Sequence, residues 1–376
     1  MNGREIFFDL INRKSNKAPK WFMSFFNEKT AQNLLGEDNV PNDCLPEFEF
    51  NLGGSNKSEW NKKINYAKAC GHFAITAGFG ACIAFGHGGP GEFAEHMTET
   101  GENYRISVFE TGTKKEVKYN PHFYHHYDYP VNGPEDICKI NLPDPRDDSR
   151  YIGLKEEAEY YKKHGYIVCA SLNGFFSGLH YFLYPYDLLL ADILLEPEFI
   201  GEMLEILGNF NLAAAEEMLK RGIDMINFCD DLGTGTSMLI SPELYRRFFF
   251  PWHKKLADLC HSYGAYLHMH SHGNINSVMD DIYKSGVDIL NPCDPCDGMD
   301  LIELKKRYGD KIIFAGGINK FFFEWDKNKQ SEYIEDLVKK AGGGFILMDS
   351  GGVPENVTRE QFESIRGIFG GYCSGV

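Results

Sequence analysis

The 376-residue sequence has few basic side chains for its size. It carries 38 Lys and Arg against 54 Asp and Glu, which gives a formal net charge of −16 at pH 7 and a pI near 5.3. The basic residues are scattered and form no continuous stripe. Because an acidic surface repels phosphate backbones, we expect no nucleic-acid partner.

Long hydrophobic runs and a disulfide framework are also missing. The most apolar segment, YPYDLLLADILLEPEFI (184–200), is interrupted by acids and proline, so we expect no membrane span. The N-terminal MNGREIFFDLINRKSNK lacks the basic and apolar regions of a signal peptide. Ten irregularly spaced cysteines do not suit a secreted disulfide scaffold of this length. These absences together indicate a cytoplasmic protein.

What the sequence does contain, over its last two thirds, is an alternation of short apolar runs and helical patterns. Ser241 and Pro242, for example, form a typical helix start between two such runs. The apolar runs are GYIVCASLNG (165–174), IDMINFCDDLG (223–233), AYLHMHSHG (265–273), VDILNPCDP (287–295), KIIFAGGI (311–318) and GFILMDSGG (344–352). Strands separated by helices of this length predict parallel βα units.

Five or six consecutive βα units favour a closed (β/α)₈ TIM barrel, which we expect to form a single domain over residues 1–376. The alternative is an open doubly wound sheet, but no glycine-rich phosphate loop follows a first strand. The region near residues 100–150 breaks the rhythm. RISVFETGTKKEVKY (105–119) predicts a β-hairpin that turns at Gly112-Thr113. The following NPHFYHHYDYPVNGPEDICKINLPDPRDD (120–148) predicts an irregular excursion over one end of the barrel, with His122, His125 and His126 in surface or loop packing.

Three histidines alternate at the end of one predicted strand. Because alternate strand residues point to one face, His268, His270 and His272 are expected to leave the backbone on the same side. Two such imidazoles could bind one Zn²⁺ with a third ligand from another loop. We predict His270 and His272 as metal ligands, with His270 also catalytic. His268 lies deepest, and it is either a substrate contact or a structural residue.

Two adjacent acids follow the strand before the histidines. Only one of Asp230 and Asp231 can face the barrel lumen, and we favour Asp231 as a catalytic carboxylate and Asp230 as a substrate contact. The alternative for either is an Asx turn or helix cap.

Two further strand ends carry polar groups. Cys293, from the pair Cys293 and Cys296, could supply a thiolate to the metal, although a buried loop cysteine is the simpler interpretation. Asp349 and Ser350 precede glycines that let a ligand approach the backbone, so we predict them as substrate contacts, with a tight turn as the alternative.

The order of the motifs resembles the uroporphyrinogen decarboxylase superfamily, which also holds corrinoid-linked methyltransferases of the methylcobamide:coenzyme M type. The resemblance is clearest from about residue 150 onward, in CDDLGTGTSMLISPELYRRFFFPWHKKL, HSHGNINSVMDDIYKSGVDILNPCDP, FAGGI and GGFILMDSGGVPENV. It implies a (β/α)₈ barrel with a cleft at the carboxyl ends of the strands.

The resemblance is nearer to the methyltransferase branch. The decarboxylases carry an arginine-rich segment where this chain has WFMSFFNEKT (21–30), and a histidine where it has Ser350 and Gly351. The methyltransferases hold zinc with an HxCGN motif and a later cysteine. Here His270 matches, His272 replaces the cysteine and Ser350 stands at the third position, so Cys293, Asp231 or Asp349 would complete the site.

The resemblance therefore implies an enzyme that moves a methyl group between a small methylated substrate or thiol and a corrinoid, such as methylcobalamin, on a partner protein. Zinc would assist the transfer. The rival interpretations are a decarboxylase of the uroporphyrinogen type and a barrel that binds a ligand without catalysis. The sequence leaves the oligomeric state open, a homo-oligomer included.

Overall fold

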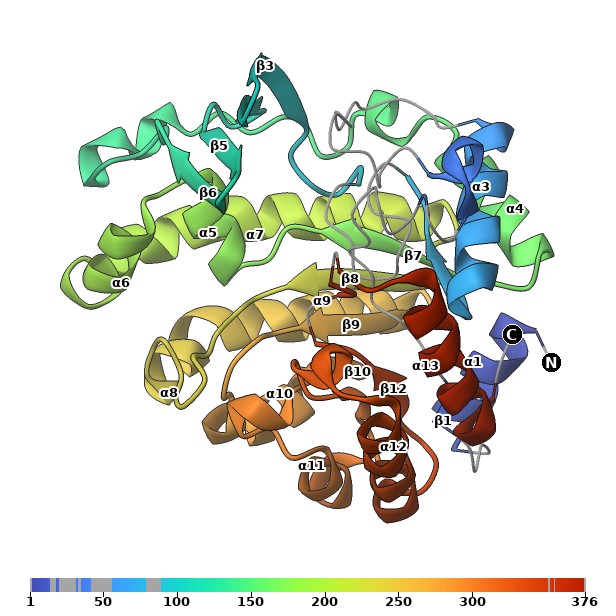
Figure 1. The fold of residues 1–376 in the computed structure, drawn as a ribbon. Helices are drawn as coiled ribbons and strands as arrows, with labels where there is room; N and C mark the ends of the chain where they lie inside the picture. Colours follow the sequence, from blue (N-terminus) through green and yellow to red (C-terminus); the bar gives the residue numbers. More distant parts are fainter. Residues whose placement is uncertain are drawn as a thin grey trace.

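A parallel β-sheet forms the centre of the molecule. The computed structural model describes residues 2–13, 18–19, 32, 35–41, 56–78, 89–350, 352–354 and 356–374 (Figure 1). Within these residues seven parallel strands pair in the order β12-β11-β10-β9-β8-β7-β2. Their bounds are β2 Ala74–Thr76, β7 Ile167–Leu172, β8 Met225–Cys229, β9 Tyr266–His270, β10 Ile289–Cys293, β11 Ile313–Gly317 and β12 Ile346–Met348. The strands follow one another across the sheet in chain order, as in a TIM barrel and unlike a doubly wound sheet, which confirms the predicted fold class; seven of the eight expected strands pair in this sheet among the described residues.

Helices connect and cover the strands (Figure 1). Ser241 caps the expected helix start, where its side chain accepts a hydrogen bond from the Leu244 amide. That helix is interrupted by a π-helical turn, Tyr245–Phe249. The main helices are α1 Gly3–Ile11, α3 Lys57–Cys70, α4 Leu154–Lys163, α5 Phe176–Phe182, α6 Tyr186–Leu195, α7 Pro197–Lys220, α8 Pro242–Leu244, α9 Phe250–Ser262, α10 Met279–Ser285, α11 Leu301–Tyr308, α12 Lys327–Ala341 and α13 Arg359–Tyr372. Among the residues placed here, no helix combines the length and apolar character needed to cross a membrane.

The β12 edge of the sheet meets the first part of the chain. The short strand β1, Ala18–Pro19, contacts β12 and pairs in parallel with β13, Cys373–Ser374. The segment 21–30, which was compared with the arginine-rich segment of the decarboxylases, lies outside the described residues, as does Gly351.

The excursion near residues 100–150 is more regular than expected. The hairpin is confirmed, but it belongs to a four-stranded antiparallel sheet, β3-β4-β5-β6. The loop predicted for His122, His125 and His126 is wrong, because these residues lie in the edge strand β6. The surface alternative fits His125, whose side chain is 43% exposed. The bounds are β3 Glu95–Gly101, β4 Tyr104–Phe109, β5 Lys114–Tyr119 and β6 His122–Tyr127. Aromatic residues on both faces of β6 hide the alternation that normally marks a strand.

The excursion sheet packs against α5, which follows the carboxyl end of β7. The Thr113 hydroxyl donates to the Phe182 carbonyl (2.7 Å), and the Tyr129 hydroxyl donates to the His180 carbonyl (3.0 Å). The excursion therefore lies against the helix that follows the carboxyl end of β7.

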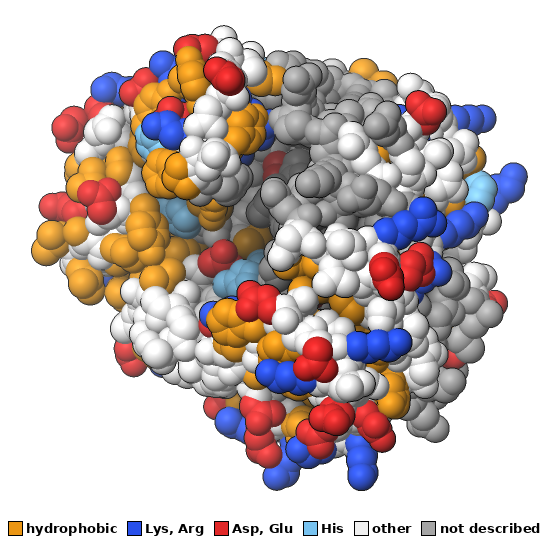
Figure 2. Space-filling model, viewed as in Figure 1, with side chains coloured by type: hydrophobic (Ala, Val, Ile, Leu, Met, Phe, Trp, Pro, Cys, Tyr) orange, Lys and Arg blue, Asp and Glu red, His pale blue; other side chains and the backbone are white. Residues whose placement is uncertain are grey.

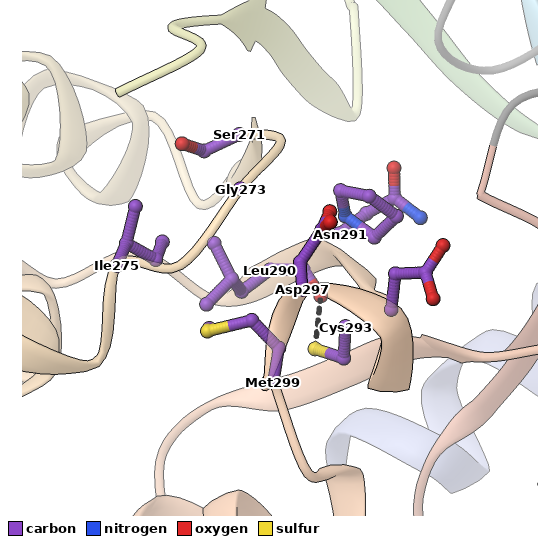
Figure 3. Close-up of a pocket in the computed structure, with 10 residues that line it drawn as sticks. Ser271, Gly273, Ile275, Leu290, Asn291, Cys293, Asp297 and Met299 are labelled. Atoms are coloured by element: carbon purple, nitrogen blue, oxygen red, sulfur yellow. Dashed lines mark hydrogen bonds between the residues drawn. The ribbon is translucent and has the colours of Figure 1, made fainter. Parts of the chain in front are cut away.

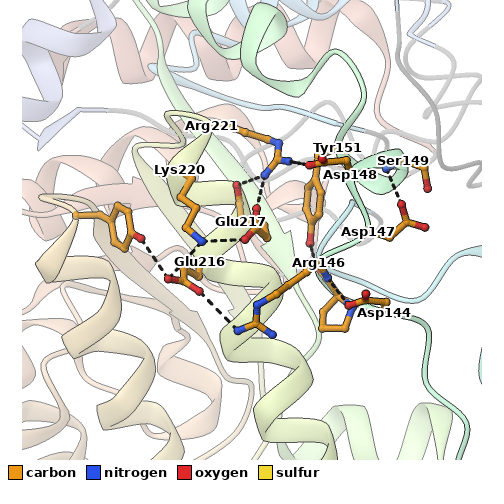
Figure 4. A network of polar contacts seen from close by, with 12 residues as sticks. Asp144, Arg146, Asp147, Asp148, Ser149, Tyr151, Glu216, Glu217, Lys220 and Arg221 are labelled. Carbon is orange, nitrogen blue, oxygen red and sulfur yellow. Dashed lines mark hydrogen bonds and ion pairs between the residues drawn. The ribbon is translucent and has the colours of Figure 1, made fainter.

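Surface ion pairs tie the end of the excursion to α7 (Figure 4). Arg221 contacts Glu217 within α7 (2.7 Å) and reaches Asp148 (2.5 Å), while Arg146 reaches Glu216 (3.7 Å). Because the Asp148 side chain is 91% exposed, we assign this network little stabilising energy, on the order of 0–1 kcal/mol per pair.

Candidate functional site

Strand register brings three polar side chains together at the barrel mouth. Cys229 ends β8, His270 ends β9 and Asn291 lies near the end of β10. Cys229 is the register partner of His270, and His270 is the register partner of Asn291. Register partners in a parallel sheet point to the same face, so the three side chains form one row at the carboxyl ends of the strands. Barrel enzymes place their chemistry at this end.

Asp231, two residues beyond Cys229, completes a group of metal-binding atoms. Its Oδ1 lies 3.7 Å from the Cys229 Sγ and 3.9 Å from the His270 Nε2. Ligand atoms of Cys229, Asp231 and His270 all lie within 4.8 Å of one another, the one such group found among the described residues. We call these three residues the donor group. In the space-filling view, histidine and acidic side chains meet in the central hollow (Figure 2).

Neighbouring contacts fix the orientation of the donor group. The His270 Nδ1 lies 2.5 Å from the Asn291 Oδ1, so this ring nitrogen carries the proton and the Nε2 faces Asp231. The Asn291 amide in turn donates to the Ala315 carbonyl (3.1 Å). The Asp231 Oδ1 accepts a hydrogen bond from the His272 backbone amide (2.8 Å).

The two adjacent acids have different surroundings. The Asp231 side chain is 36% exposed, in agreement with the prediction that it faces the lumen. Asp230 is fully buried, and its Oδ2 lies 2.8 Å from the His253 Nε2 while its Oδ1 accepts from the Ser177 amide (2.9 Å). His253 in turn contacts the Tyr245 hydroxyl at 3.1 Å. The predicted substrate contact at Asp230 is therefore wrong, because both carboxylate oxygens are engaged inside the protein.

The other two histidines of the run take different positions. His268 is fully buried in the barrel interior, where burial lowers the pKa of its imidazole well below the usual value. Of the two options for His268, the structural one fits this position and the substrate contact does not. His272 lies beyond β9, with its ring centroid 4.8 Å from that of His270. The donor group includes His270 but not His272.

The loops after β8 and β9 cross in close contact. Gly273 has a φ of +88°, and a Cβ built there would lie 2.1 Å from the Gly233 carbonyl carbon. Only glycine permits this approach, which holds the two loops that carry Asp231 and His272 against each other.

Cys293, Asp349 and Ser350 do not join the donor group. Cys293 is buried, and its thiol donates to the Leu290 carbonyl (Figure 3); burial also raises the pKa of this thiol. Ser350 is buried and donates to the Ile318 carbonyl (2.9 Å). Asp349 is also buried, and it accepts a hydrogen bond from the Gly352 amide. The Cys293 contact matches the alternative of a buried cysteine, and the Asp349 contact with Gly352 matches a tight turn, whereas Ser350 links its loop to the end of β11. All three differ from the predicted metal and substrate contacts.

Cys229 is the donor that sequence reasoning missed. Burial, followed by the nearby Asp231 carboxylate, raises the pKa of its thiol. The sequence contains one indication of this role. Cys229 precedes Asp231 by two residues, and residues two apart on a strand point to the same face.

Comparisons with known proteins identify the family to which the sequence is related. Residues 108–366 match the profile of the family described as Uroporphyrinogen decarboxylase (URO-D). Two curated relatives, both named Methylcobamide:CoM methyltransferase MtbA, come from Methanosarcina mazei and Methanosarcina acetivorans. The first is 24% identical over 159 residues, covering 41% of this chain and 44% of the relative. The second is 25% identical over 146 residues, covering 38% and 40%. The chain thus matches less than half the length of these relatives.

A solved structure supports the fold. It is described as a methyltransferase from Methanosarcina mazei and superimposes with a TM-score of 0.68 over 99% of both chains, at 12% identity. The fold is therefore shared over the full length of the chain, and the family profile spans well over half of it. This chain belongs to the uroporphyrinogen decarboxylase family.

Proposed function

We propose that this protein is a methyltransferase that moves a methyl group between a small methylated substrate or thiol and a corrinoid carried by a partner protein. The observation that carries the proposal is the donor group at the barrel mouth. The similarity to two methylcobamide:CoM methyltransferases supports it.

The donor group fits a catalytic zinc. Cysteine, carboxylate and imidazole are all zinc ligands, and catalytic sites use three protein ligands with one open position. Tetrahedral coordination at usual bond lengths separates ligand atoms by about 3.4–3.6 Å. The distances of 3.7 Å and 3.9 Å from the Asp231 Oδ1 are therefore close to those of a formed site. When bound, zinc would supply Lewis acidity toward the heteroatom that carries or accepts the methyl group.

The chain's own residues have separable tasks in this proposal. Asn291 holds the His270 ring by its Nδ1, so that the Nε2 is directed at the donor position. Asp231 reaches into the hollow while its Oδ1 is held by the His272 amide. Asp230, through Ser177 and His253, keeps the loop after β8 in place.

One thiolate with oxygen and nitrogen donors is a harder set than two thiolates, which favours oxygen- or nitrogen-linked methyl groups over thioethers.

Metal analysis after purification without chelators tests the proposal. We expect about one zinc per chain in the wild type and a large loss in Cys229→Ala and His270→Ala. Cys138→Ser is the matched control, because Cys138 is an exposed cysteine remote in sequence from the donor group. Methyl transfer between methylcobalamin and a thiol, followed by cobalamin absorbance, should fall in the same two variants.

Two results would contradict the proposal. Wild-type zinc content in both variants would remove the donor group from metal binding. Porphyrinogen decarboxylation, or ligand binding with neither zinc nor methyl transfer, would favour one of the rival functions.

A further inference from the structure

A chain of hydrogen bonds leads from the helix after the β8 loop to Asp231, the proposed metal ligand. The Tyr245 hydroxyl lies 3.1 Å from the His253 Nδ1, and the His253 Nε2 lies 2.8 Å from the Asp230 Oδ2. The Asp230 Oδ1 accepts from the Ser177 amide (2.9 Å), and the Ser177 hydroxyl accepts from the Asp231 amide (3.3 Å). We call Tyr245, His253, Asp230 and Ser177 the support chain.

The support chain lies inside the protein, and all four of its members are buried. The His253 ring packs beside Phe175, with 5.6 Å between the ring centroids, and beside Phe228, with 5.0 Å. Hydrogen bonds in such a water-poor environment are stronger than in water, and a lost partner is costly. The support chain can therefore hold its members in one arrangement.

The hydrogen bonds along the support chain have a defined direction. A carboxylate only accepts, so the His253 Nε2 carries the proton that is donated to Asp230. In the tautomer that this requires, the Nδ1 accepts from the Tyr245 hydroxyl. Burial, followed by the Asp230 charge, raises the pKa of Tyr245, so its hydroxyl keeps the proton that it donates. The imidazole is thus held at both ring nitrogens.

A π-helical turn brings Tyr245 and His253 to the same side of their helix. The two residues are eight apart, and a regular α-helix would place their side chains about 80° apart around the axis. The turn Tyr245–Phe249 contains one extra residue, since the Phe250 amide donates to the Tyr245 carbonyl five residues earlier. The remaining offset is that of seven α-helical residues, about 20°. The turn therefore permits the contact.

Pro251 explains the position of this turn. It has no N–H to donate to the Arg247 carbonyl four residues earlier, and in a regular α-helix its ring would clash with that carbonyl. A wider turn directly before the proline relieves the clash. Pro251 is thus an indirect determinant of the contact between Tyr245 and His253.

We propose that Tyr245 and His253 are positioning residues for Asp231. They hold one carboxylate oxygen of Asp230, while the other oxygen and the Ser177 hydroxyl fix the backbone of the loop that carries Asp231. The Asp231 Oδ1 is thereby kept 3.7 Å and 3.9 Å from the other two ligand atoms of the donor group. The inference rests on the proposed function, because it concerns how a proposed metal ligand is held.

A purely structural role is the competing interpretation, since a buried hydrogen-bond chain also stabilises the fold. The two interpretations differ in what they predict for the metal. A structural role changes only the free energy of unfolding. A positioning role also changes metal affinity and the coordination geometry, because a displaced loop moves one ligand atom relative to the other two.

Metal affinity measured beside stability tests the inference. Tyr245→Phe removes one oxygen atom and leaves the His253 Nδ1 without its donor. We expect zinc affinity, measured by chelator competition, to fall about ten-fold, the lower end of the range for groups that orient a ligand. The visible absorption bands of the cobalt(II)-substituted protein should shift as well. His253→Gln keeps an N–H donor for Asp230, so it should retain more zinc affinity than His253→Leu.

Tyr161→Phe is the matched control. Tyr161 is equally buried, and its hydroxyl donates to the buried Glu157 Oε1 (2.8 Å) within α4, a helix that contains no member of the donor group. This variant should lower the urea midpoint about as much as Tyr245→Phe does, with the zinc affinity and the cobalt spectrum of the wild type.

The inference is overturned if Tyr245→Phe matches Tyr161→Phe in zinc affinity and cobalt spectrum, or if His253→Gln binds zinc no better than His253→Leu. Failure of the proposed function looks different, since it appears as zinc retained in Cys229→Ala and His270→Ala. Zinc lost in those two variants, with unchanged affinity in Tyr245→Phe, would refute the positioning role alone. A wild type without zinc affinity would overturn both.

Discussion

Replacing the adjacent acids Asp230 and Asp231 by alanine, one at a time, should mainly affect different properties of the protein: stability for Asp230 and zinc binding for Asp231. In Asp230→Ala, the His253 Nε2 and the Ser177 amide both lose their partner inside the protein. Each buried donor left without its partner costs about 1–3 kcal/mol, so we expect the two losses together to cost on the order of 3–5 kcal/mol. In Asp231→Ala, the side chain is 36% exposed and the hydrogen bond from the His272 amide is lost, so we expect a cost of about 1 kcal/mol.

Urea unfolding followed by circular dichroism, together with zinc analysis, would separate the two roles. Asp230→Ala should lower the free energy of unfolding by about 3–5 kcal/mol. Asp231→Ala should remain close to the wild type in stability but lose zinc. Asp230→Asn serves as a control, since it keeps the shape and an oxygen acceptor for the Ser177 amide and should therefore be milder than the alanine variant. The reasoning is refuted by an Asp230→Ala protein as stable as Asp231→Ala, or by an Asp231→Ala protein that retains its zinc.

Three other predictions follow from single contacts. Asn291→Ala should weaken zinc binding about 10- to 100-fold, as judged by chelator competition, because the His270 ring loses the group that orients it. Gly273→Ala should be destabilised in urea by more than about 1 kcal/mol, since alanine resists a φ of +88° and the added carbon meets the facing loop. Asp288 raises the pKa of His261, chiefly by a hydrogen bond. The stabilisation from this pair is therefore present at low pH and lost as the pH rises through the raised pKa of His261. In urea titrations, His261→Gln should reduce the free energy of unfolding more at pH 5.5 than at pH 8.5. An equal reduction at both pH values would contradict this.

Much of the barrel could be predicted from the sequence because its strands are buried on both faces. A buried parallel strand appears as a short apolar run, and β7 is buried along its whole length. Polar residues at the ends of such apolar runs stand out in the sequence, and this pattern predicts Asp231 and His270 as site residues. Strand alternation predicts that only one of Asp230 and Asp231 faces the lumen, whereas the structure is needed to show that Asp231 is the more exposed of the two.

Spacing along the strand places Cys229 on the same face as Asp231, but the closeness of Cys229 to His270 depends on register between strands, which a single sequence does not contain. Cys229 joins the donor group because β8 and β9 pair it with His270. Regular strand alternation would place Cys293 on the same face as Asn291, two residues earlier, but the pairing of β10 with β11 shifts between Leu290 and Cys293. That irregularity ends the alternation and leaves the Cys293 thiol on the Leu290 carbonyl.

The donor group is linked to α5 through hydrogen bonds at the start of that helix. Asp230 holds the Ser177 amide, and Ser177 accepts from the Asp231 amide. A change at Asp230 therefore reaches both Asp231, the proposed metal ligand, and the helix α5 that carries His180 and Tyr181. Substitution of Tyr181 leaves these hydrogen bonds in place. Zinc content should consequently be unchanged by substitution at Tyr181, whereas Asp230→Ala should lower zinc content together with stability.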